Sequence, residues 1–276
     1  MQQVEARGLT FDVYEGGPPG GPAVLLLHGF PQDHREFELI APRLHDAGLR
    51  TYALDQRGYS PGARPPFVSE YRLTEAVADA VAVLDGLGVD AAHVIGHDWG
   101  AQIGWMLAAL HPDRVRTLTA VSVPHPMALR LALRSRPSQR ARFAYMGVFR
   151  SPVAEWLLLA GNGVMLRAMM RPIGYRAHLY AEAMREPGRL TGALNWYRAL
   201  SARAFEGVRL IKVPTTYVWS DKDPVVGLTA ALRTADWVEA GYELVAMKGI
   251  GHWVPEEAPG ALADAALARI AFHGSR

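Results

Sequence analysis

The chain has 276 residues, half of them apolar, and its 29 basic and 27 acidic residues leave a formal charge of only +2. This near balance excludes a general affinity for nucleic acid or for an anionic membrane. The absence of cysteine excludes disulfides, a thiolate nucleophile and cysteine metal sites. The N-terminus lacks the pattern of a signal peptide, and no apolar run approaches membrane-spanning length. We therefore expect a soluble cytoplasmic protein with one large domain, or one domain carrying an insertion.

The first half of the chain alternates short apolar runs with helical patterns. Apolar runs predict strands at 23–27, 50–54, 93–95 and 115–123. Helical spacing predicts helices at 36–47, with Gly48 as C-terminal cap, at 74–87, with Thr74 as N-cap, and at 102–110. This order predicts an α/β fold, a mostly parallel sheet with helices on both faces.

The alternation stops after Pro124 and resumes near residue 215. From 125 to 208 the sequence shows helical patterns, many arginines and methionines, and no convincing strand. Strands are again expected at 215–219 and 242–246, followed by a closing helix at 259–272. We therefore predict a core formed by residues 1–124 and 209–276, interrupted by a helical cap at 125–208.

Residues 96–100 read Gly-His-Asp-Trp-Gly, between a predicted strand and a predicted helix. A strand, a tight turn and a helix form the nucleophile elbow of many hydrolases, and Asp98 occupies the nucleophile position. Gly96 and Gly100 suit a strained turn where the helix packs closely on the strand. Taken alone, the aspartate is equally well explained as a helix N-cap.

An elbow nucleophile needs an acid and a histidine that follow it in the chain. Asp223 comes just after the strand at 215–219, and His252 just after the strand at 242–246. The carboxyl ends of parallel strands lie at one edge of the sheet, where such folds place their sites. Asp221 is the competing acid and is the weaker candidate.

The segment His-Gly-Phe-Pro at 28–31 follows the first strong strand, where these hydrolases place a backbone N–H of the oxyanion hole. The predicted donors are the N–H groups of Phe30 and Trp99. A turn containing glycine and proline also occurs without any catalytic reason.

With HGFP, DQRGYS, GHDWGA and GHWVP in this order, the chain resembles the α/β-hydrolase superfamily over essentially its whole length. Within that superfamily it is similar to epoxide hydrolases and haloalkane dehalogenases, which use an aspartate where esterases and lipases use serine. The resemblance implies an eight-stranded, mostly parallel sheet with a helical cap. It also implies that no metal or organic cofactor takes part.

Epoxide hydrolases place two cap tyrosines at the epoxide oxygen. The segment LTGALNWYRAL resembles the second tyrosine motif and points to Tyr197, while Phe143-Ala144-Tyr145 with Phe149 points to Tyr145 as the first. Tyr175 and Tyr180 are the alternatives. Many members have a glutamate at the position of Gln32, which can still hydrogen-bond water but supplies no charge. The expected substrate-binding residues are His28, Pro31, Gln32, Phe149, Trp196 and Trp253.

We therefore predict that the chain opens a hydrophobic epoxide with water to give a vicinal diol. An ester of Asp98 would form first, and water activated by the His252–Asp223 pair would then hydrolyse it. The prediction involves no nucleic acid and no membrane, and it allows for a homodimer.

Three alternatives stand beside this prediction. Haloalkane dehalogenases share the aspartate and hold halide with a tryptophan, present here as Trp99, and with a second donor that is often an asparagine where this chain has Phe30. Fluoroacetate dehalogenases usually have arginine where Trp99 stands. A noncatalytic receptor on the same fold is the alternative from another class.

Two remaining patterns need an interpretation. Between Met127 and Arg150 the chain has six arginines and no acidic residue. A solvated cap face is the simpler explanation, and the sharper hypothesis is attraction of an anionic substrate, such as an epoxy fatty acid, or of an acidic partner surface. His28 and His97 lack further ligands at metal spacing, so we expect both to be structural.

Overall fold

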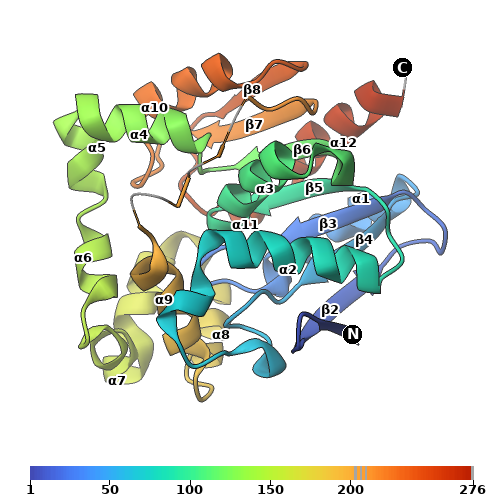
Figure 1. Cartoon of the computed structure of the whole chain (residues 1–276). Helices are drawn as coiled ribbons and strands as arrows, with labels where there is room; N and C mark the ends of the chain where they lie inside the picture. The colour runs from blue at the N-terminus through green and yellow to red at the C-terminus, as the bar shows by residue number, and fades with distance from the viewer. Residues whose placement is uncertain (202–203, 206, 209, 275–276) are drawn as a thin grey trace.

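The computed structural model describes residues 1–201, 204–205, 207–208 and 210–274. Within them an eight-stranded sheet has the order β1-β2-β4-β3-β5-β6-β7-β8 (Figure 1). The first three of these strands pair antiparallel and the rest parallel, which confirms the predicted fold class. The strands are β1 (Gln2–Ala6), β2 (Leu9–Gly16), β3 (Ala23–Leu27), β4 (Arg50–Leu54), β5 (Ala92–His97), β6 (Val115–Val121), β7 (Thr215–Ser220) and β8 (Tyr242–Met247).

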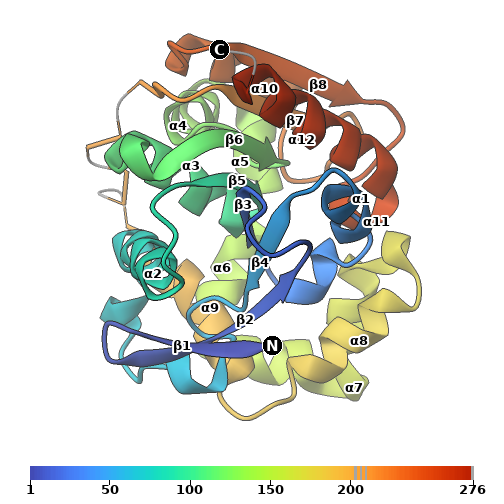
Figure 2. The same ribbon diagram turned by 90° about the vertical axis from the view of Figure 1, so that its right-hand side faces the viewer.

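Helices cover both faces of this sheet. On one side lie α2 (Leu73–Gly86) and α3 (Trp99–Leu110), and on the other α1 (Ala41–Asp46), α11 (Val254–Glu257) and α12 (Pro259–Gly274), as Figure 2 shows. The side chains of β3 alternate between the two cores: Leu25 and Leu27 pack with α2 and α3, whereas Val24 and Leu26 pack with α1 and α12. A strand buried on both faces must be apolar throughout, which explains the run Ala-Val-Leu-Leu-Leu.

Between β6 and β7 the chain is helical. The helices are α4 (Pro126–Ser135), α5 (Pro137–Arg142), α6 (Tyr145–Arg150), α7 (Ala154–Met169), α8 (Arg176–Ala183) and α9 (Arg189–Ala199), and α10 (Leu228–Arg233) follows β7. They gather at one end of the sheet (Figure 1). Apolar side chains of α6 to α9 form a separate core with Phe30, Tyr59 and Trp253, whereas buried apolar residues of α4 and α10 belong to the core against the sheet. Residues 202, 203 and 206, near the end of the predicted cap, lie outside the described residues.

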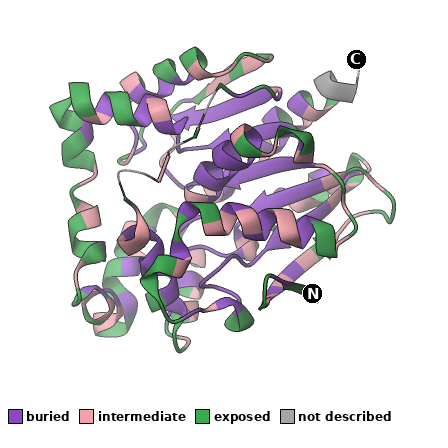
Figure 3. Ribbon diagram, viewed as in Figure 1, coloured by how far each residue is buried: buried purple, intermediate pink, exposed green. Residues whose placement is uncertain are grey.

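Figure 3 shows the central strands buried and the outer sides of α5 and α6 exposed. Among the described residues, no helix is both long and apolar enough to cross a membrane.

The structure departs from the predicted helices at three starting points. One is that of α3, which begins at Trp99 and not at residue 102. The helix expected at 36–47 is a 3-10 turn (His34–Phe37) followed by the shorter α1, whose first turn contains Pro42. Proline fits the start of a helix, where its missing N–H is not needed. Thr74 is not the N-cap of α2 as predicted, because the helix already begins at Leu73, after Arg72.

Candidate active site

Asp98 occupies a tight turn between β5 and α3. Its backbone angles are φ 51° and ψ −115°, a conformation that costs energy for any residue other than glycine. The side chain caps no N–H group of α3, so the N-cap explanation does not apply. A Cβ atom on Gly100 would lie 1.8 Å from the Leu27 carbonyl oxygen, and one on Gly96 would lie 2.3 Å from the Gly100 oxygen. Both glycines are therefore required by close packing at the turn.

Two loops at the carboxyl ends of β7 and β8 bring an acid and a histidine to Asp98. His252 Nε2 lies 3.4 Å from Asp98 Oδ2, and His252 Nδ1 lies 2.9 Å from Asp223 Oδ2. The other oxygen of Asp223 accepts a hydrogen bond from the Val225 N–H at 2.6 Å. Asp221 is exposed and accepts instead from the Gly249 N–H. The structure thus pairs His252 with Asp223 and not with Asp221.

The His252 loop is held by its backbone. The His252 carbonyl oxygen accepts a hydrogen bond from Ser122 Oγ at 2.8 Å and lies 2.9 Å from His97 Nε2. The other ring nitrogen of His97 lies 3.3 Å from Glu36 Oε2. His97 therefore supports the site from behind, in agreement with a structural role.

Charge at the site is concentrated on three side chains. Burial lowers the pKa of His252, but the charge and hydrogen bond of Asp223, together with Asp98, outweigh burial and raise it to about 10. Burial opposes ionisation of Asp98, but its hydrogen bond and charge interaction with His252 keep its pKa below the ordinary value. At neutral pH an imidazolium therefore lies between two carboxylates, and Asp98 is ionised.

The loop after β3 places a backbone donor at the carboxylate. The Phe30 N–H donates to Asp98 Oδ1 at 3.0 Å. A Cβ on Gly29 would lie 2.5 Å from the Asp98 Cβ, so glycine is needed for this approach. The Trp99 N–H, the other expected donor, belongs to the first residue of α3 and adjoins Asp98.

Two tyrosines from the helical insertion lie close together, with a ring separation of 6.3 Å between Tyr145 on α6 and Tyr197 on α9. Phe149 packs edge-on against both. Burial raises the pKa of both hydroxyls, and the charge of Asp98 adds to the effect. Both side chains therefore keep their protons and can donate hydrogen bonds at neutral pH. Of the alternatives, Tyr175 is exposed and Tyr180 donates to Glu256 at 2.6 Å.

Two cavities meet at Asp98, Tyr145 and Tyr197. The first, of about 430 Å³, extends along α4 past Leu129 and Leu133. The second, of about 520 Å³, passes His252 and extends toward α7; its wall includes Phe30, Phe149, Met165, Met169 and Trp253. Each cavity has the size of a small-molecule site, and both are lined mainly by apolar groups.

Four predicted substrate-binding residues line neither of these cavities: His28, Pro31, Gln32 and Trp196. They are buried behind the site. His28 Nε2 accepts a hydrogen bond from the Gln56 N–H, and Trp196 Nε1 donates to the Arg57 carbonyl oxygen. Gln32 donates to Glu256. The polar groups of His28 and Trp196 are thus engaged within the wall, whereas Gln32 Oε1 is buried with no hydrogen-bond partner among the described residues.

Sequence reasoning missed Glu36 as a neighbour of the site. It is fully buried, one of its oxygens has no hydrogen-bond partner, and the other accepts from the Gly29 N–H at 3.4 Å. Burial raises its pKa well above the ordinary value. Its place within a predicted helix gave no sign of this position.

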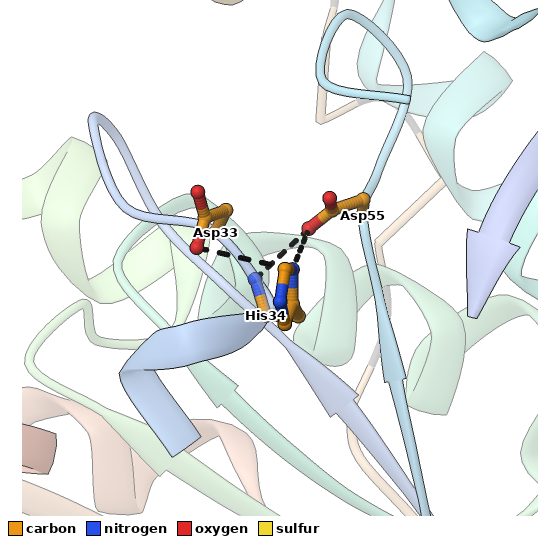
Figure 4. Close-up of side chains that lie close together, drawn as sticks. All are labelled: Asp33, His34 and Asp55. Carbon is orange, nitrogen blue, oxygen red and sulfur yellow. Dashed lines mark hydrogen bonds and ion pairs between the residues drawn. The ribbon is translucent and has the colours of Figure 1, made fainter. Parts of the chain in front are cut away.

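Asp33, His34 and Asp55 lie close together (Figure 4). Each offers one atom that could bind a metal ion, and these atoms lie within 4.8 Å of one another. Asp55 Oδ1 accepts a hydrogen bond from the backbone N–H of His34 and also lies beside the His34 Nδ1 atom, both at 2.9 Å. The oxygens of Asp33 accept from Arg35 at 2.6 and 2.8 Å and from Arg189 at 2.5 Å. These contacts describe an ion-pair network that ties α9, the helix of Tyr197, to the core.

Comparison with known proteins shows the family of the chain. The profile of a family described as alpha/beta hydrolase fold matches residues 22–259. Epoxide hydrolase A of Mycobacterium tuberculosis is 32% identical, over 96% of this chain and 95% of that protein. The chain belongs to the epoxide hydrolases of the α/β-hydrolase fold. Also similar is the AB hydrolase superfamily protein YfhM of Bacillus subtilis, 31% identical over 94% of this chain and 93% of that protein.

A solved structure of an epoxide hydrolase has the same fold. The crystal structure of Epoxide Hydrolase A from Mycobacterium thermoresistibile matches with a TM-score of 0.84 and 29% identity, over 98% of this chain and 97% of that one. The family resemblance inferred from the sequence motifs is thereby confirmed. The roles of the individual site residues stay predictions.

Proposed function

We propose that this epoxide hydrolase converts a hydrophobic epoxide and water into a vicinal diol through a covalent ester of Asp98. The observation that carries the proposal is an ionised carboxylate at the junction of two apolar cavities, beside two protonated tyrosines. Carboxylate suits displacement at saturated carbon when the leaving oxygen is stabilised. The insertion at 125–208 would act as a cap that shapes the substrate site.

In the first step, one oxygen of Asp98 attacks a ring carbon while the bond from that carbon to the epoxide oxygen breaks. The alkoxide takes a proton from Tyr145 or Tyr197, which leaves a tyrosinate and an ester of Asp98. Because a buried tyrosinate is poorly solvated, each tyrosine keeps its proton in the free enzyme. It gives the proton up only when the epoxide oxygen becomes negative.

Ester formation also changes His252. Asp98 loses its negative charge, so the pKa of His252 falls, and its proton can return to the tyrosinate. Neutral His252, held by Asp223, then accepts a proton from the water that attacks the ester carbonyl. The Phe30 and Trp99 N–H groups would stabilise the resulting oxyanion. As the tetrahedral intermediate collapses, the leaving alkoxide takes the proton of the hydroxyl that water added, so the diol is released, the Asp98 carboxylate is restored and His252 stays protonated.

A single-turnover experiment in H₂¹⁸O, with enzyme in excess over an aryl epoxide, tests this sequence. The oxygen added to the first diol should come from Asp98 and be unlabelled, while Asp98 gains ¹⁸O. Later turnovers should then produce labelled diol. Label in the diol of the first turnover would contradict the ester and indicate direct attack by water. Asp98→Asn is the control and should form no diol in the single turnover.

The predicted cytoplasmic location and homodimer stay predictions from the sequence.

A further inference from the structure

Six arginines of the helical insertion carry charge that no acidic side chain of the described residues balances. Among the residues that the structure describes, none of them forms an ion pair with a carboxylate: Arg130, Arg134, Arg136, Arg140, Arg142 and Arg150. Other arginines of the insertion do pair, such as Arg176 with Glu256 and Arg198 with Glu155. Arg167 and Arg171, farther along the insertion, also form no ion pair within the described chain, but only the segment from α4 to α6 combines six such arginines with no acidic residue.

Part of this charge reaches the first cavity. Arg130, Arg134 and Arg150 contribute to its wall. Arg150 donates to the Tyr197 and Leu200 carbonyl oxygens. Arg130 and Arg134 lie one turn apart on α4, are exposed, and show no hydrogen bond from their guanidinium groups within the described chain. These two cations are free to bind a ligand.

The rest of the cavity wall limits what that ligand can be. Asp98 is the acidic residue among the described lining residues, and it lies at the junction with the second cavity. Apolar side chains line the cavity between that junction and α4, including Leu129, Leu133 and Phe143. A negative group on the substrate would be repelled by Asp98 and attracted by α4. An uncharged chain would connect it to the reacting carbon.

We propose that the first cavity binds epoxides carrying a carboxylate at the end of an apolar chain, with the carboxylate at Arg130 and Arg134. The inference rests on the proposed function and adds a substrate class to it. Guanidinium groups match the geometry of a carboxylate. The other ring substituent would occupy the second cavity. Besides His252, whose charge is shared with two carboxylates, that cavity has Arg142, which already donates to the Asp223 carbonyl oxygen, and Lys222, which is a single charge.

The test compares matched internal epoxides that end in a carboxylate or in a primary alcohol, with several chain lengths. At low salt the wild-type enzyme should show a KM about tenfold lower for the carboxylate, and the difference should shrink at high salt because salt screens exposed charges. Arg130→Gln with Arg134→Gln should raise the carboxylate KM about five- to tenfold, the size expected of two partly exposed ion contacts. The KM for the alcohol should not change.

Arg72→Gln with Arg136→Gln is the matched control, since both side chains are exposed and line neither cavity. It removes the same charge and should leave the preference intact. Arg130→Lys with Arg134→Lys, which keeps both charges, should leave it intact as well. The inference would be overturned if the wild-type enzyme had equal KM values for the carboxylate and the alcohol, or if the control variant raised the carboxylate KM as much as the double variant at 130 and 134. Loss of the preference only in Lys222→Met would also overturn it. Turnover of neither substrate would instead contradict the proposed function.

Discussion

Asp98→Asn should release the proton that His252 holds in the free enzyme. The Asp98 and His252 charges are 3.4 Å apart, and with an effective dielectric constant of about 20 they attract each other by roughly 5 kcal/mol. About 1.4 kcal/mol corresponds to one pKa unit. Loss of this attraction is therefore sufficient to bring the pKa of His252 from about 10 to near the ordinary histidine value of about 6.5. The asparagine side chain is neutral, like the Asp98 ester that the proposed mechanism forms, so this variant has the charge of the intermediate.

NMR titration of the His252 ring measures this directly, with His252→Gln used to assign its resonances. In the wild-type protein the ring should remain protonated through pH 8, and in Asp98→Asn it should titrate between about pH 6 and 7. A ring that stays protonated at pH 9 in Asp98→Asn would show that Asp223 alone retains the proton. Ester formation would then not produce a base, and the proposed second step would be wrong.

Further predictions concern the tyrosines, the elbow and the pH dependence of stability. Tyr197→Phe and Tyr145→Phe should each slow ester formation about 100-fold in rapid-mixing experiments while leaving ester hydrolysis nearly unchanged; equal slowing of both steps would contradict their role as donors to the epoxide oxygen. Gly100→Ala, whose Cβ would lie 1.8 Å from a backbone oxygen, should lower the free energy of unfolding by about 3 kcal/mol or more. Gly147→Ala, with nothing within 4 Å of the new Cβ, should be neutral or slightly stabilising in the same denaturation assay, and similar losses in both would refute the packing argument. Because the folded pKa of His252 is raised to about 10, its contribution to stability is complete below about pH 6.5 and is lost as the pH rises through about 10. Urea denaturation of wild type and His252→Gln across this range should therefore show a narrowing difference, and a constant difference would count against the ion pair.

The parts of the fold that could be predicted from sequence are those where one local pattern determines the result. The apolar run of β3 is buried on both sides, so its composition alone indicates a central parallel strand. Gly96 and Gly100 are required by backbone contacts within the elbow itself, and the short motif contains them. The order of Asp98, Asp223 and His252 sufficed to place them together because they follow β5, β7 and β8, which run parallel and end at one edge of the sheet.

Other features depend on contacts between distant segments. Strands β1 and β2 were not predicted, because their hairpin is at the sheet edge, is partly exposed and turns at Arg7 and Gly8 without a strong turn signature. His28 and Trp196 lie within the expected motifs, yet their side chains are engaged inside the wall. A motif gives the position of a residue in the chain and not which side of the wall it faces. The junction of the two cavities likewise requires the insertion to be placed on the core.

The covalent ester of Asp98 is the central claim, and intact-protein mass spectrometry of His252→Gln tests it most directly. Without the base, ester hydrolysis should stall while Asp98 can still attack. After mixing with aryl and alkyl epoxides, the variant should gain the mass of one whole epoxide, and the same variant with Asp98→Asn added should gain none. Absence of an adduct in folded His252→Gln, with an epoxide that the wild-type enzyme turns over, would contradict the account.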